Sequence, residues 1–260
     1  LVYCKMSVGS THHLEMVFVW KQNYILVDEY FFFCCTWIVN SAVNKMSHRI
    51  ETEAITEREL SLVSLSLLYH FFCFEPQKAL INNMLNSDIL NLWHSKWDMD
   101  IHETNTFLQN QDALERLQAD HLALFVGIGM PKAVPWGSVY LTEENLLLQR
   151  STHALTAFLK SHRIILCTDE QQISDHIGLC LSVLALLLKQ WGDYPEETTE
   201  RTIREFLRDH LLPWSGRFCE LLTAHAETPL YALLGKVTKR ILKDQQHQWQ
   251  ITPRSRTLYY

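Results

Sequence analysis

Apolar residues recur at helical spacing along most of the chain beyond residue 50. Within 53–74, Leu60, Val63, Leu67 and Phe71 share one stripe, the pattern of a helix that buries one face. The same spacing predicts further helices, covering about 77–85, 103–125, 142–161, 174–188, 197–211, 214–226 and 229–247. Neither a set of strands nor an internal repeat stands out. The expected fold class is therefore all-α, a helical bundle.

One segment rich in chain breakers interrupts the helical pattern. Residues 127–137 read GIGMPKAVPWG, with three glycines and two prolines in eleven positions. This composition predicts a loop, so we place a hinge at 131–141 between a helical part at 46–130 and a second one at 142–260. Thr142, followed by Glu143 and Glu144, is expected to cap the next helix, since acidic side chains favour a first turn.

The first 45 residues differ from the rest in composition. They hold 9 of the 29 aromatic residues and three of the seven cysteines, without proline and without a sustained periodic pattern. Ordinary helical sequence begins after Met46. We interpret Met46 as the natural start and 1–45 as a doubtful N-terminal extension, read from upstream sequence. The alternative is a genuine hydrophobic appendage.

The net charge and the cysteine pattern limit which partners and which cellular compartment suit this protein. The formal net charge is −6, which suits a cationic partner better than a nucleic acid. Seven cysteines without a C-x-x-C pair form neither a regular disulfide framework nor a zinc motif. The longest uncharged runs, 30–44 and 60–74, have 15 residues each, whereas a bilayer span needs about 20. These features favour a cytoplasmic protein.

Motifs for common chemistries are missing from the sequence. The pair Gly127 and Gly129 lacks the third glycine and the preceding strand of a dinucleotide site. The sequence holds no G-x-x-x-x-G-K-[ST], no G-x-S-x-G and no H-E-x-x-H. We therefore expect no metal and no cofactor.

Two places could nevertheless bind a ligand. Asp175 and His176 open the most apolar helix, where a carboxylate complements the helix dipole and a histidine faces the preceding loop. Capping alone explains this pair equally well. Trp136 lies on a loop stiffened by Pro131 and Pro135, which suits a peptide anchor. An indole that fills its own core is the alternative.

Six short segments resemble the TorD/DmsD family of chaperones for molybdenum-cofactor enzymes, in both order and spacing. They are 124–127 (LFVG), 134–141 (VPWGSVYL), 151–152 (ST), 175–178 (DHIG), 210–218 (HLLPWSGRF) and 228–231 (TPLY). The resemblance spans about 50–247 and is strongest to the DmsD branch. It implies an all-helical fold with a larger N-terminal and a smaller C-terminal subdomain joined by a hinge.

The resemblance also implies a function. Members of this family are cytoplasmic chaperones that bind the twin-arginine signal peptide of a molybdenum oxidoreductase precursor, here of the dimethyl sulfoxide reductase type. They hold back export until the enzyme is matured and show no established catalytic turnover. The resemblance therefore implies no catalytic residue and a protein that is not an enzyme. The export machinery is a second partner that the resemblance suggests. The peptide-binding positions carried over to this chain are Leu124, Phe125, Pro135, Trp136, Asp175 and His176.

The physical chemistry of such a peptide fits these positions. Two guanidiniums need carboxylate or carbonyl acceptors, and the apolar stretch that follows them needs a hydrophobic groove. We expect Asp175 to meet the charged part, while Leu124, Phe125, Pro135 and Trp136 hold the apolar part. The chain departs from the family pattern at His121, where relatives carry tryptophan, and at 149–150 (QR), where relatives tend to have Gly-Asp.

Two other hypotheses remain open at the level of sequence. In the first, the protein is an enzyme that uses His176 as a general base beside Asp175, with a nucleotide substrate. In the second, it is a structural adapter that forms a dimer by exchanging helices across the 127–141 segment, a tendency of the family. A monomer is the alternative to this dimer.

Overall fold

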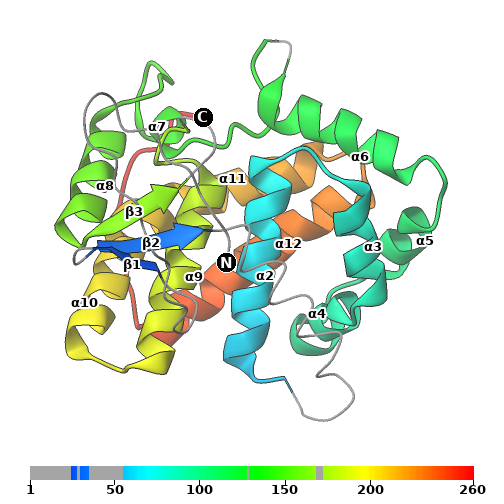
Figure 1. Cartoon of the computed structure of the whole chain (residues 1–260). Helices are drawn as coiled ribbons and strands as arrows, with labels where there is room; N and C mark the ends of the chain where they lie inside the picture. The colour runs from blue at the N-terminus through cyan, green and yellow to red at the C-terminus, as the bar shows by residue number, and fades with distance from the viewer. Residues whose placement is uncertain (1–24, 28–29, 35–54, 128, 168–171) are drawn as a thin grey trace, which may run out of the picture.

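The computed structural model describes residues 25–27, 30–34, 55–127, 129–167 and 172–260. Met46 and most of the expected extension at 1–45 lie outside the described residues, so that boundary stays a prediction. Figure 1 shows a molecule made mostly of helices, which confirms the expected helical class. The helices, two of them π-helices (η), are α2 (Glu57–Cys73), α3 (Lys78–Asn86), α4 (Ile89–Trp97), α5 (His102–Leu108), α6 (Ala113–His121), η1 (Leu122–Val126), α7 (Gly137–Leu141), α8 (Arg150–Ser161), α9 (Ile177–Asp193), α10 (Glu197–Glu205), η2 (Phe206–Leu211), α11 (Leu212–His225) and α12 (Pro229–Gln248).

A small sheet accompanies the helices, which the sequence pattern did not indicate. Strand β1 (Ile25–Val27) pairs antiparallel with β2 (Tyr30–Cys34), and β2 pairs in parallel with β3 (Ile164–Cys167). Figure 1 places this sheet beside α8, on the opposite side of the molecule from α3, α4 and α5. The four residues of β3 are too few to show a periodic pattern, and their partner strand is remote in sequence.

Several expected boundaries are wrong for local reasons. The helix expected at 103–125 is divided into α5, α6 and η1, because a turn at 109–112 ends α5. Thr142 ends α7 instead of starting a helix, and its hydroxyl donates to the carbonyl of Ser138 at 2.9 Å. Helix α8 starts only at Arg150, after a loop in which Asn145 and Leu148 have positive φ. Helix α4 was not expected at all.

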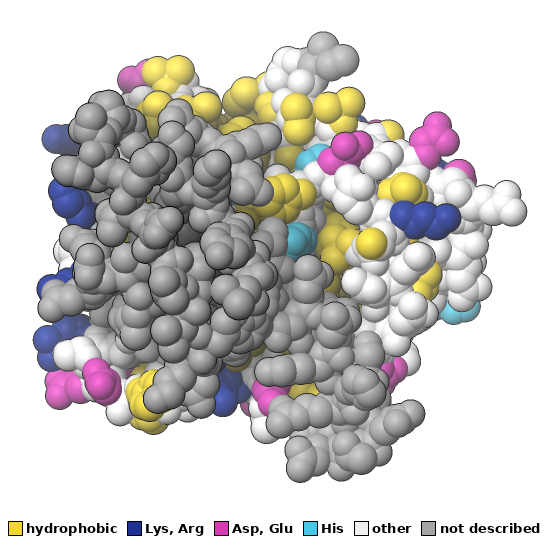
Figure 2. All heavy atoms as spheres, in the orientation of Figure 1, with side chains coloured by type: hydrophobic (Ala, Val, Ile, Leu, Met, Phe, Trp, Pro, Cys, Tyr) yellow, Lys and Arg dark blue, Asp and Glu magenta, His cyan; other side chains and the backbone are white. Residues whose placement is uncertain are grey.

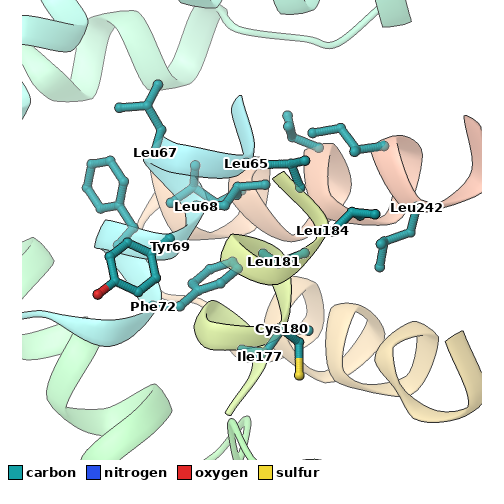
Figure 3. Packing of buried hydrophobic residues seen from close by; sticks show 14 of the residues in the cluster. Leu65, Leu67, Leu68, Tyr69, Phe72, Ile177, Cys180, Leu181, Leu184 and Leu242 are labelled. Atoms are coloured by element: carbon teal, nitrogen blue, oxygen red, sulfur yellow. The ribbon is translucent and has the colours of Figure 1, made fainter. Parts of the chain in front are cut away.

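The core joins helices from both sides of the expected hinge. Every residue of α9 from Ile177 to Leu188 is buried, as expected for a central helix that is apolar on all sides. Figure 3 shows Leu65 and Phe72 of α2 near Leu181 and Leu184 of α9. Because α2 precedes residues 131–141 and α9 follows them, the two halves share one hydrophobic core. The division into a larger and a smaller subdomain stays a prediction.

A close packing contact begins helix α7. A Cβ on Gly137 would lie 2.6 Å from Cε2 of Trp214, whose indole is buried and donates to the carbonyl of His210 at 2.8 Å. The indole is therefore held in place and cannot move away from an added methyl group. We expect Gly137→Ala to lower the free energy of unfolding by about 1–3 kcal/mol, measured by urea denaturation.

Gly216 of α11 provides the matched control. A Cβ there meets no atom within 4 Å. Because alanine favours a helix over glycine, Gly216→Ala is expected to raise stability by about 0.5–1 kcal/mol. Equal effects of the two substitutions would contradict the assigned contact between Gly137 and Trp214.

Candidate functional site

The loop that carries Trp136 lies against the segment that enters α9. The amide of Ile177 donates to the carbonyl of Pro135 at 2.7 Å, and the amide of Gly137 donates to the carbonyl of Asp175 at 3.0 Å. Trp136 and His176 thus pair as an isolated antiparallel bridge. These backbone bonds bring four of the six expected positions, Pro135, Trp136, Asp175 and His176, to one corner.

Asp175 organises this corner from within. Its side chain is buried, and Oδ2 accepts a hydrogen bond from the amide of Ser138 at 2.7 Å and from Oγ1 of Thr152 at 3.0 Å. The carboxylate therefore joins the start of α7 to α8. Its other oxygen, Oδ1, has no hydrogen-bond partner among the described residues. This oxygen is an acceptor that a ligand could use.

His176, and not Asp175, caps helix α9. The helix expected from residue 174 starts only at Ile177, and Nδ1 of His176 accepts from the amide of Gly178 at 3.2 Å. Burial lowers the pKa of His176 to about 3, so the ring is neutral at pH 7. A base with so low a pKa is poorly matched to neutral pH, and this weighs against an enzyme that relies on His176.

Trp136 is neither fully exposed nor enclosed in the core. The residue is partly exposed, and its ring stands edge to face on His176 with centroids 5.6 Å apart. Its Nε1 is buried and finds no acceptor among the described residues. Tryptophan that is packed on one side usually needs a partner for this N–H. Nε1 of Trp136 and Oδ1 of Asp175 are thus two buried polar atoms at this corner without a partner among the described residues.

Leu124 and Phe125 lie inside the molecule. Their exposed fractions are 0% and 3%, and Phe125 packs on the rings of Phe72 and Phe218. Because both side chains are buried in the core, they do not line the surface of the corner. A π-helix holds both residues, so the side chains that face outward here do not follow from α-helical spacing.

Exposed apolar side chains occur near Leu124 and Phe125 in sequence and in the loop between α7 and α8. Leu122, Val126 and Met130 are 47%, 58% and 58% exposed, and Leu146, Leu147 and Leu148 are exposed in the loop between α7 and α8. Figure 2 shows hydrophobic side chains along the upper edge of this face. We call these six residues the apolar edge. None of the six was expected from the sequence, although three consecutive leucines in a polar loop are a usable signal.

His121, where the sequence departs from the family pattern, is buried in the core. Its Nδ1 lies 3.0 Å from the hydroxyl of Tyr231, which also contacts the carbonyl of Phe71 at 3.2 Å. Burial lowers the pKa of His121 to about 4. At this position, where the resemblance leads us to expect tryptophan, the chain thus has a polar residue whose hydrogen bond is made inside the protein. Arg150, the other departure, is exposed at the start of α8.

We searched the described residues for a cluster of metal ligands and for a helix that could span a membrane, and found neither. No group of three or more His, Cys, Asp or Glu side chains there is arranged to hold a metal ion. No helix among the same residues combines the length and the apolar content that crossing a membrane requires.

Comparisons with known proteins find a matching family model and relatives that are named chaperones. The family model described as nitrate reductase delta subunit matches residues 91–220. The chain is 30% identical over 189 residues to a protein of Haemophilus influenzae named probable Tat proofreading chaperone DmsD. The aligned residues cover 71% of this chain and 87% of that protein. It is 28% identical over 200 residues to the Tat proofreading chaperone DmsD of Salmonella paratyphi A, covering 75% and 91%.

A TorD chaperone is also similar. The chaperone protein TorD of Psychrobacter sp. is 25% identical over 166 residues, with 63% of this chain and 67% of that one covered. Identity is thus higher to the two DmsD proteins than to this TorD. The chain belongs to the TorD/DmsD family, as its sequence segments indicated.

Proposed function

We propose that this protein is a cytoplasmic chaperone that binds the twin-arginine signal peptide of a molybdenum oxidoreductase precursor, of the dimethyl sulfoxide reductase type, and delays its export until the enzyme is mature. The observation that carries the proposal is the corner of Trp136, Asp175 and His176, which holds two buried polar atoms without a partner among the described residues. The two DmsD proteins that are similar to this chain are named as Tat proofreading chaperones, one of them as a probable one.

The two unpaired polar atoms suit the polar part of such a peptide. Oδ1 of Asp175 accepts from a guanidinium or a peptide N–H, and Nε1 of Trp136 donates to a peptide carbonyl. Neither atom gives up an internal hydrogen bond when a ligand arrives. The net charge of −6 increases the rate of encounter with a cationic peptide at low salt.

The apolar edge suits the stretch that follows the arginines. Burying its leucine, valine and methionine side chains contributes about 25 cal/mol for each Å² removed from water. In this proposal the apolar edge takes the surface role that was expected of Leu124 and Phe125, which are buried in the core. Pro135 fixes the backbone and accepts from Ile177, so its contribution is positional.

Peptide binding to Trp136 variants tests the proposal. We expect a labelled twin-arginine peptide to bind the protein and Trp136→Ala to raise its Kd at least tenfold, as removal of a central aromatic anchor does. Fluorescence anisotropy of the peptide measures this. Asp175 is the poorer choice for substitution, because its carboxylate also holds α7 and α8 in place.

Tyr194 provides the matched control. It is an exposed aromatic residue at the opposite end of α9, and Tyr194→Ala is expected to leave the Kd unchanged. A peptide in which lysines replace both arginines is expected to bind at least tenfold more weakly, because lysine lacks the bidentate geometry. Equal binding by wild type and Trp136→Ala would contradict the site.

That the chain has no catalytic activity is part of the same proposal. The buried, neutral His176 and the absence of a phosphate-loop motif in the sequence give no support to a nucleotide-dependent enzyme. The export machinery as a partner, and a dimer formed by helix exchange, stay predictions.

A further inference from the structure

The segment that follows α12 runs along the surface toward the loop that carries Trp136. We call residues 252–260 the strap. The amide of Arg254 donates to the carbonyl of Arg208 in η2 at 3.0 Å, and the amide of Tyr259 donates to the carbonyl of Tyr140 in α7 at 3.0 Å. At its far end, the hydroxyl of Tyr260 donates to the carbonyl of Pro131 at 2.9 Å.

An acidic group receives the charged part of the strap. Nε of Arg254 lies 2.8 Å from Oδ1 of Asp209, while Arg208 binds the other carboxylate oxygen at 2.6 Å. The Asp209 side chain is only 11% exposed, although both arginines are about half exposed. This carboxylate therefore already forms an ion pair with a guanidinium carried by an extended chain.

Aromatic rings receive the apolar part of the strap. The ring of Tyr260 stands edge to face on Tyr140 with centroids 5.5 Å apart, and Tyr140 stacks on Trp214 at 5.6 Å. Tyr140 also donates to the carbonyl of Val134 at 2.6 Å. Tyr140 and Tyr260 thus hold two carbonyls of the loop that continues into Pro135 and Trp136.

The order of residues in the strap resembles that of the expected ligand. Residues 254–260 read RSRTLYY, with two arginines followed by three apolar residues. A twin-arginine leader likewise presents two guanidiniums and then an apolar stretch. Most side chains of the strap are exposed, so little buried area opposes its release.

We propose that the strap is an internal competitor of the client leader: it occupies an arginine-accepting surface, formed by Asp209 and the Tyr140 ring, to which the leader's arginine segment binds once the strap is displaced. The inference rests on the proposed function, because it names a second part of the surface that binds the same peptide. Displacement also releases Pro131, and so couples leader binding to the loop of Trp136.

Opposite responses of strap and surface variants test this inference. In Arg254→Ala the strap loses its ion pair, so the labelled leader is expected to bind about three- to tenfold more tightly, as competition for one surface requires. Tyr260→Phe removes only the hydrogen bond to Pro131 and is expected to act in the same direction. In the Arg254→Ala background, Asp209→Asn is expected to weaken leader binding, because the strap no longer uses that carboxylate.

Arg256→Ala is the matched control. Arg256 is exposed and has no ion pair among the described residues, so its removal is expected to leave the Kd within twofold of wild type. Trypsin cleavage after Arg256 gives an independent readout, since a displaced strap is cut faster when the leader is present. Unchanged Kd in both strap variants, with wild-type binding intact, overturns the strap inference alone. Failure of every variant to bind overturns the proposed function with it.

Discussion

Acidification from pH 7 to pH 4 is expected to remove several kcal/mol of folding stability from this protein. Three histidines carry the effect, since burial lowers the pKa of His70 and His121 to about 4 and that of His176 to about 3. In the unfolded chain each titrates near 6.5. Protonation therefore occurs at a higher pH in the unfolded chain than in the folded one.

The sign and the pH range follow from these values. The stability is fully present above pH 6.5 and falls as the pH drops toward 4, because the unfolded state binds more protons throughout that range. A shift of one pKa unit corresponds to about 1.4 kcal/mol, so each histidine contributes on the order of 2–3 kcal/mol between pH 7 and pH 4. Urea denaturation at pH 7, 6, 5 and 4 measures the total.

His70 and His225 form a matched pair for this prediction. Nε2 of His70 is buried without a partner among the described residues, and its ring packs on Tyr69 and Phe74, so phenylalanine fits in its place. We expect His70→Phe to reduce the loss between pH 7 and pH 4 by about 2 kcal/mol. His225 is exposed, and His225→Phe is expected to leave the loss unchanged. Identical pH profiles of the two variants would falsify the assignment.

The long helices of this fold can be predicted from the sequence because burial imposes a period on them. Helices α2, α9 and α12 each bury a face or a whole surface over at least 17 residues, which leaves many apolar positions in register. Strand β3 and helix α4 are short, with four and nine residues, and their patterns are correspondingly weak. Strand β3 pairs with residues 30–34, a contact that local sequence does not encode.

The candidate site could be predicted only in part. The family resemblance identifies the residues of the corner, and the structure brings Trp136 against His176. The sequence could not show whether the side chains of Leu124 and Phe125 point to the surface or to the core, because apolar residues suit a peptide groove and a core equally well. The π-helix that holds them also changes which side chains face outward. Asp175 precedes α9 in sequence, but its carboxylate accepts from the amide of Ser138 in α7. Local sequence does not encode this tertiary contact.

Asp120→Ala is expected to be the most destabilising single substitution that we propose. Asp120 lies in α6, is buried, and accepts from the amide and hydroxyl of Thr228 at 2.8 and 2.7 Å and from the amide of Glu227 at 3.1 Å. Thr228 is the N-cap residue of α12, but its own side chain makes no capping bond. A carboxylate of α6 therefore caps α12 from outside the helix, where the helix dipole favours a negative charge.

Removal of this carboxylate leaves three donors without their acceptor at a buried helix end. We expect Asp120→Ala to lower the free energy of unfolding by about 3–5 kcal/mol, measured in urea at pH 7. Asp120→Asn keeps one oxygen acceptor but not the charge, so a loss of about 1–2 kcal/mol is expected. Asp112 is the control: it is exposed and pairs with Arg116 only at 4.0 Å, so Asp112→Ala is expected to cost less than about 0.5 kcal/mol.

The same substitution bears on the expected hinge. Helix α6 precedes residues 131–141 and α12 follows them, so the Asp120 contact fastens one side of the hinge to the other. If helices exchange across this segment, a variant that loosens the contact will form more dimer. We therefore expect light scattering of Asp120→Asn at rising concentration to show a larger dimer fraction than wild type, because Asp120→Asn retains enough stability to stay folded. A strictly monomeric Asp120→Asn at every concentration would show that this contact does not restrain helix exchange.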